Sequence, residues 1–440
     1  MAEWKRTTIG QFLKEREGRY SPDDKKLSGL ERLNKIDFSG EIHLSGKGSK
    51  TDMIIVAPGD LVISGINVAK GAIAVHQGDK PVTATIHYSS YVFDKDQIDI
   101  EYFKRFVKSQ TFVKTLEVRG GIKTEIKPKH FLPIEIDLPD INEQREIVSF
   151  FRCVEDEIGE LGSEISTQSR YLDMLRQAVL QEAIEGKLTG EWRKQNLDLI
   201  SGENHASKLL EKIKTEKERL IKEGKIKKDN PSSPIANEEK PFVLPQGWTW
   251  CRLGDVGIIN PRNYIDDDLE ISFSPMRLIS GKYGISPTHE KRKWGEVKKG
   301  FTHFAENDVA IAKITPCFEN SKACVFENLI NGYGAGTTEL HVLRPMQINS
   351  KYVYIFVKTA SFLKNGEKIM TGVCGQKRVP VDYFTNALLP LPPFNEQEVI
   401  ISRVNELMGM IDELEKQVVG RKDQSEMLMQ SVLQEAFANE

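Results

Sequence analysis

Residues 141–183 read INEQREIVSFFRCVEDEIGELGSEISTQSRYLDMLRQAVLQEA, and the two ends of this stretch recur near the end of the chain. Asn-Glu-Gln at 142–144 returns at 395–397, and Val-Leu-Gln-Glu-Ala at 179–183 returns at 432–436, with no gap between the two matches. Similarity at one fixed distance along a chain indicates an internal duplication. The sequence therefore predicts a module that occurs twice, each copy being a variable segment followed by this recurring one.

Both recurring segments carry an apolar seam with the four-three alternation of a coiled coil. The seam residues are Ile147, Phe151, Val154, Ile158, Leu161, Ile165, Leu172, Leu175 and Val179 in the first copy, and Ile400, Val404, Leu407, Ile411, Leu414, Val418, Leu428 and Val432 in the second. Each helix is expected to begin after Pro139 or Pro393, with Asn142 or Asn395 as its N-cap. At about 1.5 Å per residue each would be roughly 65 Å long.

Each apolar seam needs a partner, and the other helix is the simplest one. We therefore predict an α+β protein in which two mixed α/β domains are joined by two long antiparallel coiled-coil helices in a pseudo-two-fold arrangement, with the domains at opposite ends. The alternative is a pair of ordinary amphipathic helices within one globular core. The predicted regions are 1–140 (first variable domain), 141–202 (central helical region), 203–240 (charged, partly helical linker), 241–392 (second variable domain) and 393–440 (C-terminal helix).

The two variable domains are rich in short β-like runs separated by Gly, Pro, Asn and Asp. These runs are Met53–Val56, Leu61–Ile63, Ala72–Val75, Ser90–Phe93, Val309–Ala312 and Leu340–Leu343. Helices over Tyr102–Leu116 and Tyr352–Leu363 are expected to pack on the resulting sheets. A second sign of duplication is Trp4 before the first domain and Trp248 before the second.

Composition narrows the class of protein. The chain has 440 residues, 39% of them hydrophobic, and a formal net charge of −3. A slight basic excess lies in the variable domains and an acidic excess in the helices, which only weakly favours a polyanionic ligand. The sequence has no apolar stretch of the roughly 20 residues that would span a bilayer and no apolar leader. We expect a cytoplasmic protein. Five cysteines without CxxC spacing and dispersed histidines predict neither disulfides nor a metal site.

Motifs for catalysis are incomplete. Residues 391–394, Leu-Pro-Pro-Phe, resemble the Asn-Pro-Pro-Phe motif of adenine methyltransferases, but Leu391 replaces the amide that would hold the target amino group. The Gly-rich stretch 332–336 lacks the strand-then-helix setting of a cofactor loop, and Gly46–Ser49 is not an NTPase phosphate loop. A non-catalytic binding protein without a cofactor of its own is therefore the predicted class.

Several polar and basic side chains are candidates for contact with DNA, because Arg, Lys and Asn bind phosphates and base edges. In the first domain they are Ser64, Asn67, Lys70, Arg119 and Lys123. In the second they are Lys291, Arg292, Lys293, Lys298, Lys299, Lys313, Asn320, Lys322, Thr337 and Thr338. Trp294 lies inside the basic cluster at 291–299 and would give stacking or packing support. The glycines at 332–336 would supply flexible backbone or a tight turn.

The chain resembles the specificity subunits of type I restriction-modification systems. The resemblance rests on Asn-Glu-Gln at 142–144, Gly-Lys-Leu-Thr at 186–189 with Trp192-Arg193, and Leu-Pro-Pro-Phe-Asn-Glu-Gln at 391–397. The second variable domain adds Ala-Ile-Ala-Lys-Ile-Thr-Pro at 310–316 and Gly-Thr-Thr-Glu-Leu at 336–340, and the first adds Pro58–Ile63.

The resemblance implies that each variable domain is a target recognition domain for one half of a split, asymmetric site on double-stranded DNA, with the helices as a ruler between the halves. It implies assembly with two modification subunits, which bring S-adenosylmethionine, and with restriction subunits, which use ATP and Mg. None of these cofactors is expected on this chain. Two other interpretations stay open: a targeting subunit that works with a methyltransferase alone, and a structural coiled-coil adaptor without a DNA role.

Overall fold

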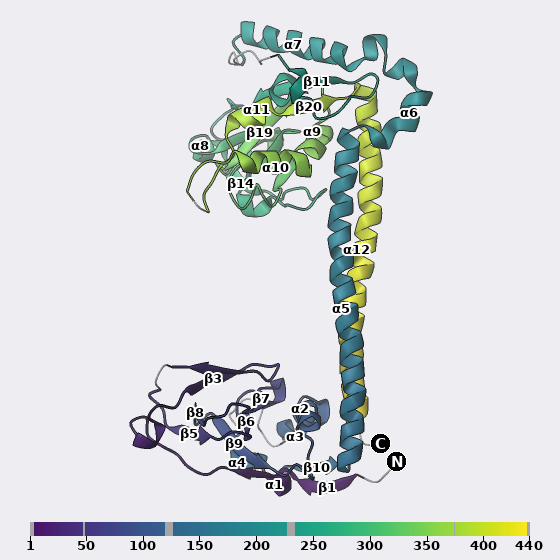
Figure 1. Ribbon diagram of the computed structural model, residues 1–440. Helices are drawn as coiled ribbons and strands as arrows, with labels where there is room; N and C mark the ends of the chain where they lie inside the picture. Colours follow the sequence, from purple (N-terminus) through teal and green to yellow (C-terminus); the bar gives the residue numbers. More distant parts are fainter. Residues whose placement is uncertain (1–3, 47–48, 119–125, 227–233, 374, 438–440) are drawn as a thin grey trace. The chain divides into compact units, whose positions relative to one another are not determined.

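The computed structural model describes residues 4–46, 49–118, 126–226, 234–373 and 375–437. The chain forms two compact units, Met1–Thr167 with Val418–Glu440, and Gln168–Gln417. Each unit contains one sheet domain and a part of both long helices, α5 (Ile141–Ile184) and α12 (Phe394–Ala436) (Figure 1). Two mixed α/β domains and a pair of long helices are therefore confirmed, whereas the predicted division into five regions stays a prediction.

The described strands of the first sheet domain form one two-stranded and two four-stranded sheets. They are β1 (Lys5–Thr8), β2 (Leu13–Glu15), β3 (Arg32–Ile36), β4 (Ile42–Ser45), β5 (Met53–Val56), β6 (Leu61–Ser64), β7 (Ile73–Val75), β8 (Val82–Thr85), β9 (Tyr88–Phe93) and β10 (Glu135–Leu138). β1 pairs with β10, and the four-stranded sheets have the orders β2-β9-β6-β7 and β4-β3-β8-β5. The predicted strands of this domain are confirmed.

The second sheet domain repeats this topology strand for strand. Its strands are β11 (Thr249–Arg252), β12 (Gly257–Ile259), β13 (Glu270–Ser274), β14 (Glu290–Lys293), β15 (Thr302–Ala305), β16 (Val309–Ala312), β17 (Ala323–Val325), β18 (Tyr333–Gly336), β19 (Leu340–Pro345) and β20 (Leu388–Leu391). β11 pairs with β20, and the two larger sheets have the orders β12-β19-β16-β17 and β14-β13-β18-β15. Even the parallel pairing recurs, between β3 and β8 and between β13 and β18. The duplication therefore includes the variable domains, whose sequences show little of it.

The other α-helices of the described residues are shorter than α5 and α12. They are α1 (Ile9–Phe12), α2 (Ile100–Phe106), α3 (Gln110–Val118) and α4 (Pro128–Phe131) in the first unit, and α6 (Gly190–Gln195), α7 (Ala206–Lys222), α8 (Trp294–Val297), α9 (Ser350–Val357), α10 (Ala360–Lys368) and α11 (Val381–Asn386) in the second. Helix α7 confirms that the charged segment is partly helical, and its Ile213 is fully buried. Among the described residues, no helix combines the length and the apolar character needed to cross a membrane.

The predictions of single helices over Tyr102–Leu116 and Tyr352–Leu363 were wrong, because each stretch is a pair of helices. A hydroxyl residue begins the second helix of each pair. Ser109 Oγ accepts a hydrogen bond from the Phe112 amide at 3.2 Å, and Thr359 Oγ1 accepts one from the Phe362 amide at 3.3 Å. These side chains take the place of backbone acceptors and interrupt the helix.

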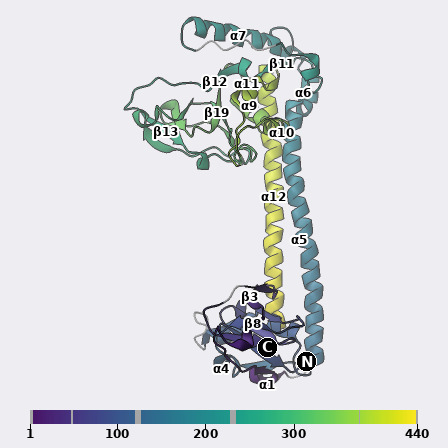
Figure 2. The ribbon, with the colours of Figure 1, turned by 60° about the vertical axis from the view of Figure 1, so that its left-hand side comes forward.

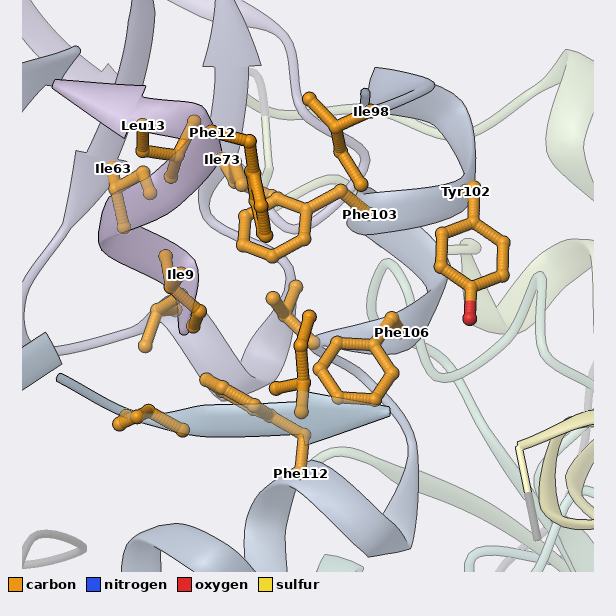
Figure 3. Packing of buried hydrophobic residues seen from close by; sticks show 14 of the residues in the cluster. Ile9, Phe12, Leu13, Ile63, Ile73, Ile98, Tyr102, Phe103, Phe106 and Phe112 are labelled. Carbon is orange, nitrogen blue, oxygen red and sulfur yellow. The ribbon is translucent and has the colours of Figure 1, made fainter. Parts of the chain in front are cut away.

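Aromatic side chains pack closely together in the larger core cluster of the first unit (Figure 3). Phe12 of α1 meets Phe103 of α2 edge to face, with their ring centroids 5.6 Å apart. Phe437, just after α12, belongs to the same cluster and stacks on Phe151 of α5 with a centroid separation of 5.7 Å. This core therefore joins the first sheet domain to the start of α5 and to the end of α12.

The long helices begin differently from the prediction. Asp140, not Asn142, caps α5, because its Oδ1 accepts hydrogen bonds from the amides of Asn142 and Glu143 at 2.8 and 3.1 Å. Asn395 is likewise not an N-cap, because α12 begins one residue earlier, at Phe394. The Asn of the repeat lies inside the first turn of both helices, where a side chain no longer caps.

The seam between the helices is largely as predicted. Both views show α5 and α12 side by side (Figures 1 and 2), and in each unit they run antiparallel. In the first unit Phe151 meets Phe437, and in the second Arg176 bonds to Asp412. Most seam residues are buried or half-buried, but Leu175 and Leu414 are each 45% exposed and Leu428 is 53% exposed. The seam assignment of these three leucines was wrong. Arg176 lies across the seam beside Leu175 and Leu414.

Candidate nucleic-acid interface

The Asn-Glu-Gln repeat attaches each sheet domain to its own long helix. Gln144 and Gln397 are completely buried. Gln144 Oε1 accepts a hydrogen bond from the Asp99 amide at 2.8 Å, and Gln397 Oε1 accepts one from the Asn349 amide at 2.8 Å. Asp99 and Asn349 are the N-caps of α2 and α9. The amide NH₂ and carbonyl groups of each buried glutamine both have hydrogen-bond partners. The glutamine therefore fixes the start of the long helix against the sheet domain in both copies.

The glutamate of the repeat binds the tryptophan that precedes each domain. Trp4 Nε1 donates to Glu143 Oε1 at 3.0 Å, and Trp248 Nε1 donates to Glu396 Oε2 at 2.8 Å. The weak sequence correspondence between the two tryptophans therefore reflects an equivalent contact.

Glu396 has two further partners that Glu143 lacks among the described residues. Its Oε1 accepts hydrogen bonds from Arg193 at 2.5 Å and from Thr189 Oγ1 at 2.6 Å. Both partners belong to the Gly-Lys-Leu-Thr…Trp-Arg motif that follows α5. This motif therefore joins the end of α5 to the start of α12 within the second unit.

A buried aspartate shapes the turn into the central strand of each domain. Asp60 precedes β6 and accepts hydrogen bonds from Arg16 and Ser90, whereas Asp308 precedes β16 and accepts them from Arg344. Burial acts to raise the pKa of Asp60, but these hydrogen bonds leave it lowered. Burial raises the pKa of the more enclosed Asp308 despite Arg344. The turns before β6 and β16 are thus each built around a buried carboxylate.

Those two loops carry six of the predicted DNA-contact residues. Ser64, Asn67 and Lys70 lie at the end of β6 and before β7, and Lys313, Asn320 and Lys322 lie between β16 and β17. Ser64 is only 4% exposed, so its hydroxyl is turned into the domain. Lys322 Nζ donates to the Met276 carbonyl at 3.2 Å, which indicates a structural contact. Asn67 and Lys313 are half-buried, whereas Lys70 and Asn320 are exposed.

The basic cluster of the second domain is paired with carboxylates of the same domain. Its ion pairs are Lys291 with Glu270, Arg292 with Glu290, Lys293 with Asp268, and Lys298 with Asp267. Lys299 is exposed and forms no ion pair within the described parts of the chain. Exposed ion pairs contribute little to stability, but they do offset the local positive charge. Trp294 is 2% exposed, so it supports packing and does not stack on a ligand.

Residues Tyr333–Gly336 of the Gly-rich stretch form a largely buried strand, β18. Gly332 ends the 3-10 turn before this strand with a φ of 74°, so the alternative of a tight turn holds for that glycine alone. A Cβ atom at Gly334 would lie 2.0 Å from the ring of Phe304, so glycine is required here by the packing of that ring. Of the two threonines that follow, Thr338 is exposed, and Thr337 Oγ1 accepts a hydrogen bond from the Glu339 amide at 3.3 Å.

Arg119, Lys123 and Leu391 were also singled out in the sequence. Arg119 and Lys123 lie outside the residues that the structure describes. Leu391, which replaces the methyltransferase asparagine, is fully buried in β20 and pairs with Thr249 of β11. The Leu-Pro-Pro-Phe stretch is thus the end of a strand and the start of α12.

An open groove of about 290 Å³ lies beside these elements in the second domain. Lys313 and Thr338 line it, together with Arg262 and His303, which the sequence did not single out. The Arg262 guanidinium donates to the Phe301 carbonyl at 3.2 Å. Burial lowers the pKa of His303, with Arg262 and Arg344 adding to the effect. None of the lining residues is acidic, so the groove presents two cations without a neighbouring carboxylate on its walls.

The second sheet domain resembles a known protein family. The family model of the type I restriction modification DNA specificity domain matches residues 245–419. The matched residues include the second sheet domain and the first part of α12.

The chain is similar to particular proteins of the same class. It is 49% identical over 262 residues to the type I restriction enzyme EcoAI specificity subunit of Escherichia coli, a match that covers 59% of this chain and 43% of that protein. The chain thus matches less than half of the length of that relative. The resemblance to type I specificity subunits drawn from the sequence is confirmed.

Two solved structures share the fold. One, described as the structural basis of complex assembly and conformational transition of the type I R-M system, has a TM-score of 0.63 at 15% identity and covers 100% of this chain and 98% of its own. The HsdS subunit from Thermoanaerobacter tengcongensis has a TM-score of 0.55 at 16% identity and covers 99% and 97%. At these identities the likeness concerns the fold alone.

Proposed function

We propose that this chain is the specificity subunit of a type I restriction-modification complex and that it reads a split, asymmetric site on double-stranded DNA. The observation that carries the proposal is the duplicated architecture. Two sheet domains have the same strand order, and a buried glutamine fixes each to its own long helix. Two sheet domains that share a topology but differ in their side chains suit a DNA site whose two halves differ in sequence.

The chemistry is assigned to partner subunits in this proposal. Two modification subunits bind S-adenosylmethionine and methylate adenine, and restriction subunits use ATP and Mg to translocate and cleave DNA. This chain contributes no catalytic residue and binds none of these cofactors. The exposed acidic faces of residues 142–184 and 395–437 are the docking surfaces for the modification subunits. The helices set the distance between the half-sites, and the complex works in the cytoplasm.

A genome-wide map of methylated adenines tests this function. The map is made in a host that expresses the cognate modification subunit, with the gene for this chain intact and deleted. We expect deletion to remove methylation from one split motif and to leave all other motifs methylated. An identical map in both strains would contradict the proposal. A structural adaptor without a DNA role predicts that identical map.

A further inference from the structure

The first sheet domain has a groove at the place that corresponds to the groove of the second. In the second domain the walls come from residues after β12, from the start of β15 and from the entry to β19. In the first domain they come from residues after β2, from β5 and from the entry to β9, and the groove has a volume of about 330 Å³. These strands are equivalent by topology, and β5 lies against β9 as β15 lies against β19.

One further contact beside the grooves is duplicated. The Lys313 carbonyl, after β16, accepts a hydrogen bond from the Val379 amide at 2.8 Å. The Gly65 carbonyl, after β6, accepts one from the Ile126 amide at 2.9 Å. In the second domain the donor, Val379, lies just before Pro380 and α11. In the first domain the donor, Ile126, lies just before α4, which begins at Pro128. The backbone around the two grooves is therefore built alike, although the sequences differ.

The side chains on this common backbone are different. The second groove carries Arg262 and Lys313 and no acidic residue. The first groove carries the carboxylates of Glu15 and Glu17 beside the basic side chains of Arg19 and Lys127. Burial raises the pKa of Glu15, and Arg19 acts against this effect. One groove thus presents mainly hydrogen-bond donors, and the other presents acceptors as well as donors.

Ion pairing favours Arg262 and Lys313 over the basic cluster at 291–298 as contacts for DNA. Lys291 and Lys293 each form an ion pair with a carboxylate, whereas neither Arg262 nor Lys313 has one among the described residues. Contact with DNA would cost these two cations no existing ion pair. Arg and Lys donate to phosphates and to guanine O6 and N7, and a glutamate accepts from the cytosine amino group.

We propose that the two equivalent grooves are the DNA-contact sites, one for each half-site, and that Arg262 and Lys313 determine recognition of the half read by the second domain. Arg19 and Glu15 have the same role for the other half. This assignment rests on the proposed function, since it names the contact site of each recognition domain. It keeps Lys313 from the sequence prediction and adds Arg262, Arg19 and Glu15, which that prediction omitted.

The test compares two double variants of the full chain, each expressed with the cognate modification subunit. Arg262→Gln with Lys313→Gln removes both cations of the second groove. Lys291→Gln with Lys293→Gln removes two cations of the paired cluster in the same domain and is the matched control. The readouts are the map of methylated adenines and the affinity of the purified complex for a duplex that carries the wild-type motif.

The groove variant is expected to lose about tenfold or more in affinity, or to accept additional bases, in one half-site only. The control variant should keep the wild-type motif and change affinity by less than about threefold. Arg19→Gln should affect the opposite half-site. Melting temperatures verify folding, and Arg262→Lys with Lys313→Arg, which keeps both charges, should restore part of the affinity.

Two results would overturn the assignment. One is a groove variant with the wild-type map and affinity. The other is an equal loss in the groove variant and the control, which would indicate a general charge effect. Failure of the proposed function is distinguishable, because then the wild-type chain itself would direct methylation to no motif. If the wild-type chain directs methylation to a split motif and the groove variant does the same with unchanged affinity, the groove assignment is overturned but the proposed function is not.

Discussion

Glu143 and Glu396 occupy the same position of the repeat in different surroundings. Glu396 is completely buried and accepts hydrogen bonds from Trp248, Thr189 and Arg193. Glu143 is half-buried, and its contact with Trp4 is the counterpart of only one of these. One sequence motif therefore serves as a buried ionic junction in the second unit and as a simple tryptophan contact in the first.

The substitution Glu396→Gln should lower the free energy of unfolding by about 3 kcal/mol, because it leaves the Arg193 guanidinium without its charged partner in a largely buried place. Glu143→Gln is the matched control and should cost less than about 1 kcal/mol. Urea denaturation of the full chain measures both. Equal losses in the two variants would show that the junction with Arg193 adds no stability.

Lys358 is a buried lysine that forms no ion pair with a carboxylate of the described residues. It is 2% exposed, and its Nζ donates to the carbonyls of Gly281 and Ser321 at 2.6 Å each. Lys108 is its equivalent in the first domain and donates to the Phe38 carbonyl at 3.2 Å. Burial lowers the pKa of Lys358 to about 7, from an ordinary value of 10.5. This lysine connects two loops of the second domain to the end of α9.

The pKa of Lys358 predicts a pH dependence of stability. Above about pH 7 the folded chain has released this proton, whereas the unfolded chain keeps it up to about pH 10.5. The wild-type chain should therefore gain about 2 kcal/mol over Lys358→Met between pH 7 and pH 9. Groups common to both chains cancel in this difference. Melting temperatures at several pH values measure it, and a difference that is constant or decreases with pH would refute the pKa shift.

The two long helices pair through an apolar seam that is interrupted by one group of ionic contacts, here called the polar crossing. Arg176 of α5 bonds to Asp412 and Glu415 of α12 at 2.7 and 3.1 Å. Its side chain is 13% exposed, and the seam leucines beside it are displaced toward solvent. Lys282, after β13, joins the same carboxylates and so connects the second sheet domain to α12.

The polar crossing should contribute measurably to the helix pairing. Arg176→Ala should lower the free energy of unfolding by about 1 to 2 kcal/mol, because hydrogen bonds between charged groups exceed neutral ones in strength. Arg403→Ala provides the control, since Arg403 pairs with Glu406 of its own helix and both are about half exposed. Its cost should stay below about 0.5 kcal/mol. If the two substitutions proved equally mild, the helix pairing would depend on the apolar seam alone.

The elements show what the sequence predicted and why other features escaped it. The long helices were predictable because their apolar period extends over many turns. The six strands named from the sequence were predictable because each is a short, largely buried run, whereas strands such as β14 are mostly exposed and gave no such signal. Leu175 and Leu414 were misassigned because a heptad pattern does not show that an arginine can cross the seam. The N-caps were misassigned because Asp140 and Asn142 are both suitable types for a cap.

The grooves could not be predicted in the same way. Their walls combine segments that are far apart in the sequence, such as the residues after β12 and the residue after β16. One signal was available and was missed: Phe-Val-Lys at 106–108 recurs at 356–358, with a hydroxyl residue after each. Aligning the two domains on this repeat would have shown which loops correspond. It would not have shown which side chains line the grooves.

The whole chain is a duplicated module. Each sheet domain is attached to its long helix in the same way, whereas the groove proposed to contact DNA differs between the two domains. Gln144 and Gln397 make the same contacts in both copies. The grooves share a backbone but carry different charges. Such a division permits one domain to be exchanged without disturbing the other, because each has its own sheets, core and glutamine.

The most direct test of this account exchanges one domain. Residues 242–392 are replaced by the corresponding domain of another type I specificity subunit, and methylated adenines are mapped in a host that expresses the cognate modification subunit. The account predicts that one half of the motif changes, while the other half and the spacer between them stay the same. A map in which both halves change, or in which neither changes, would contradict the claim that each sheet domain reads one half-site.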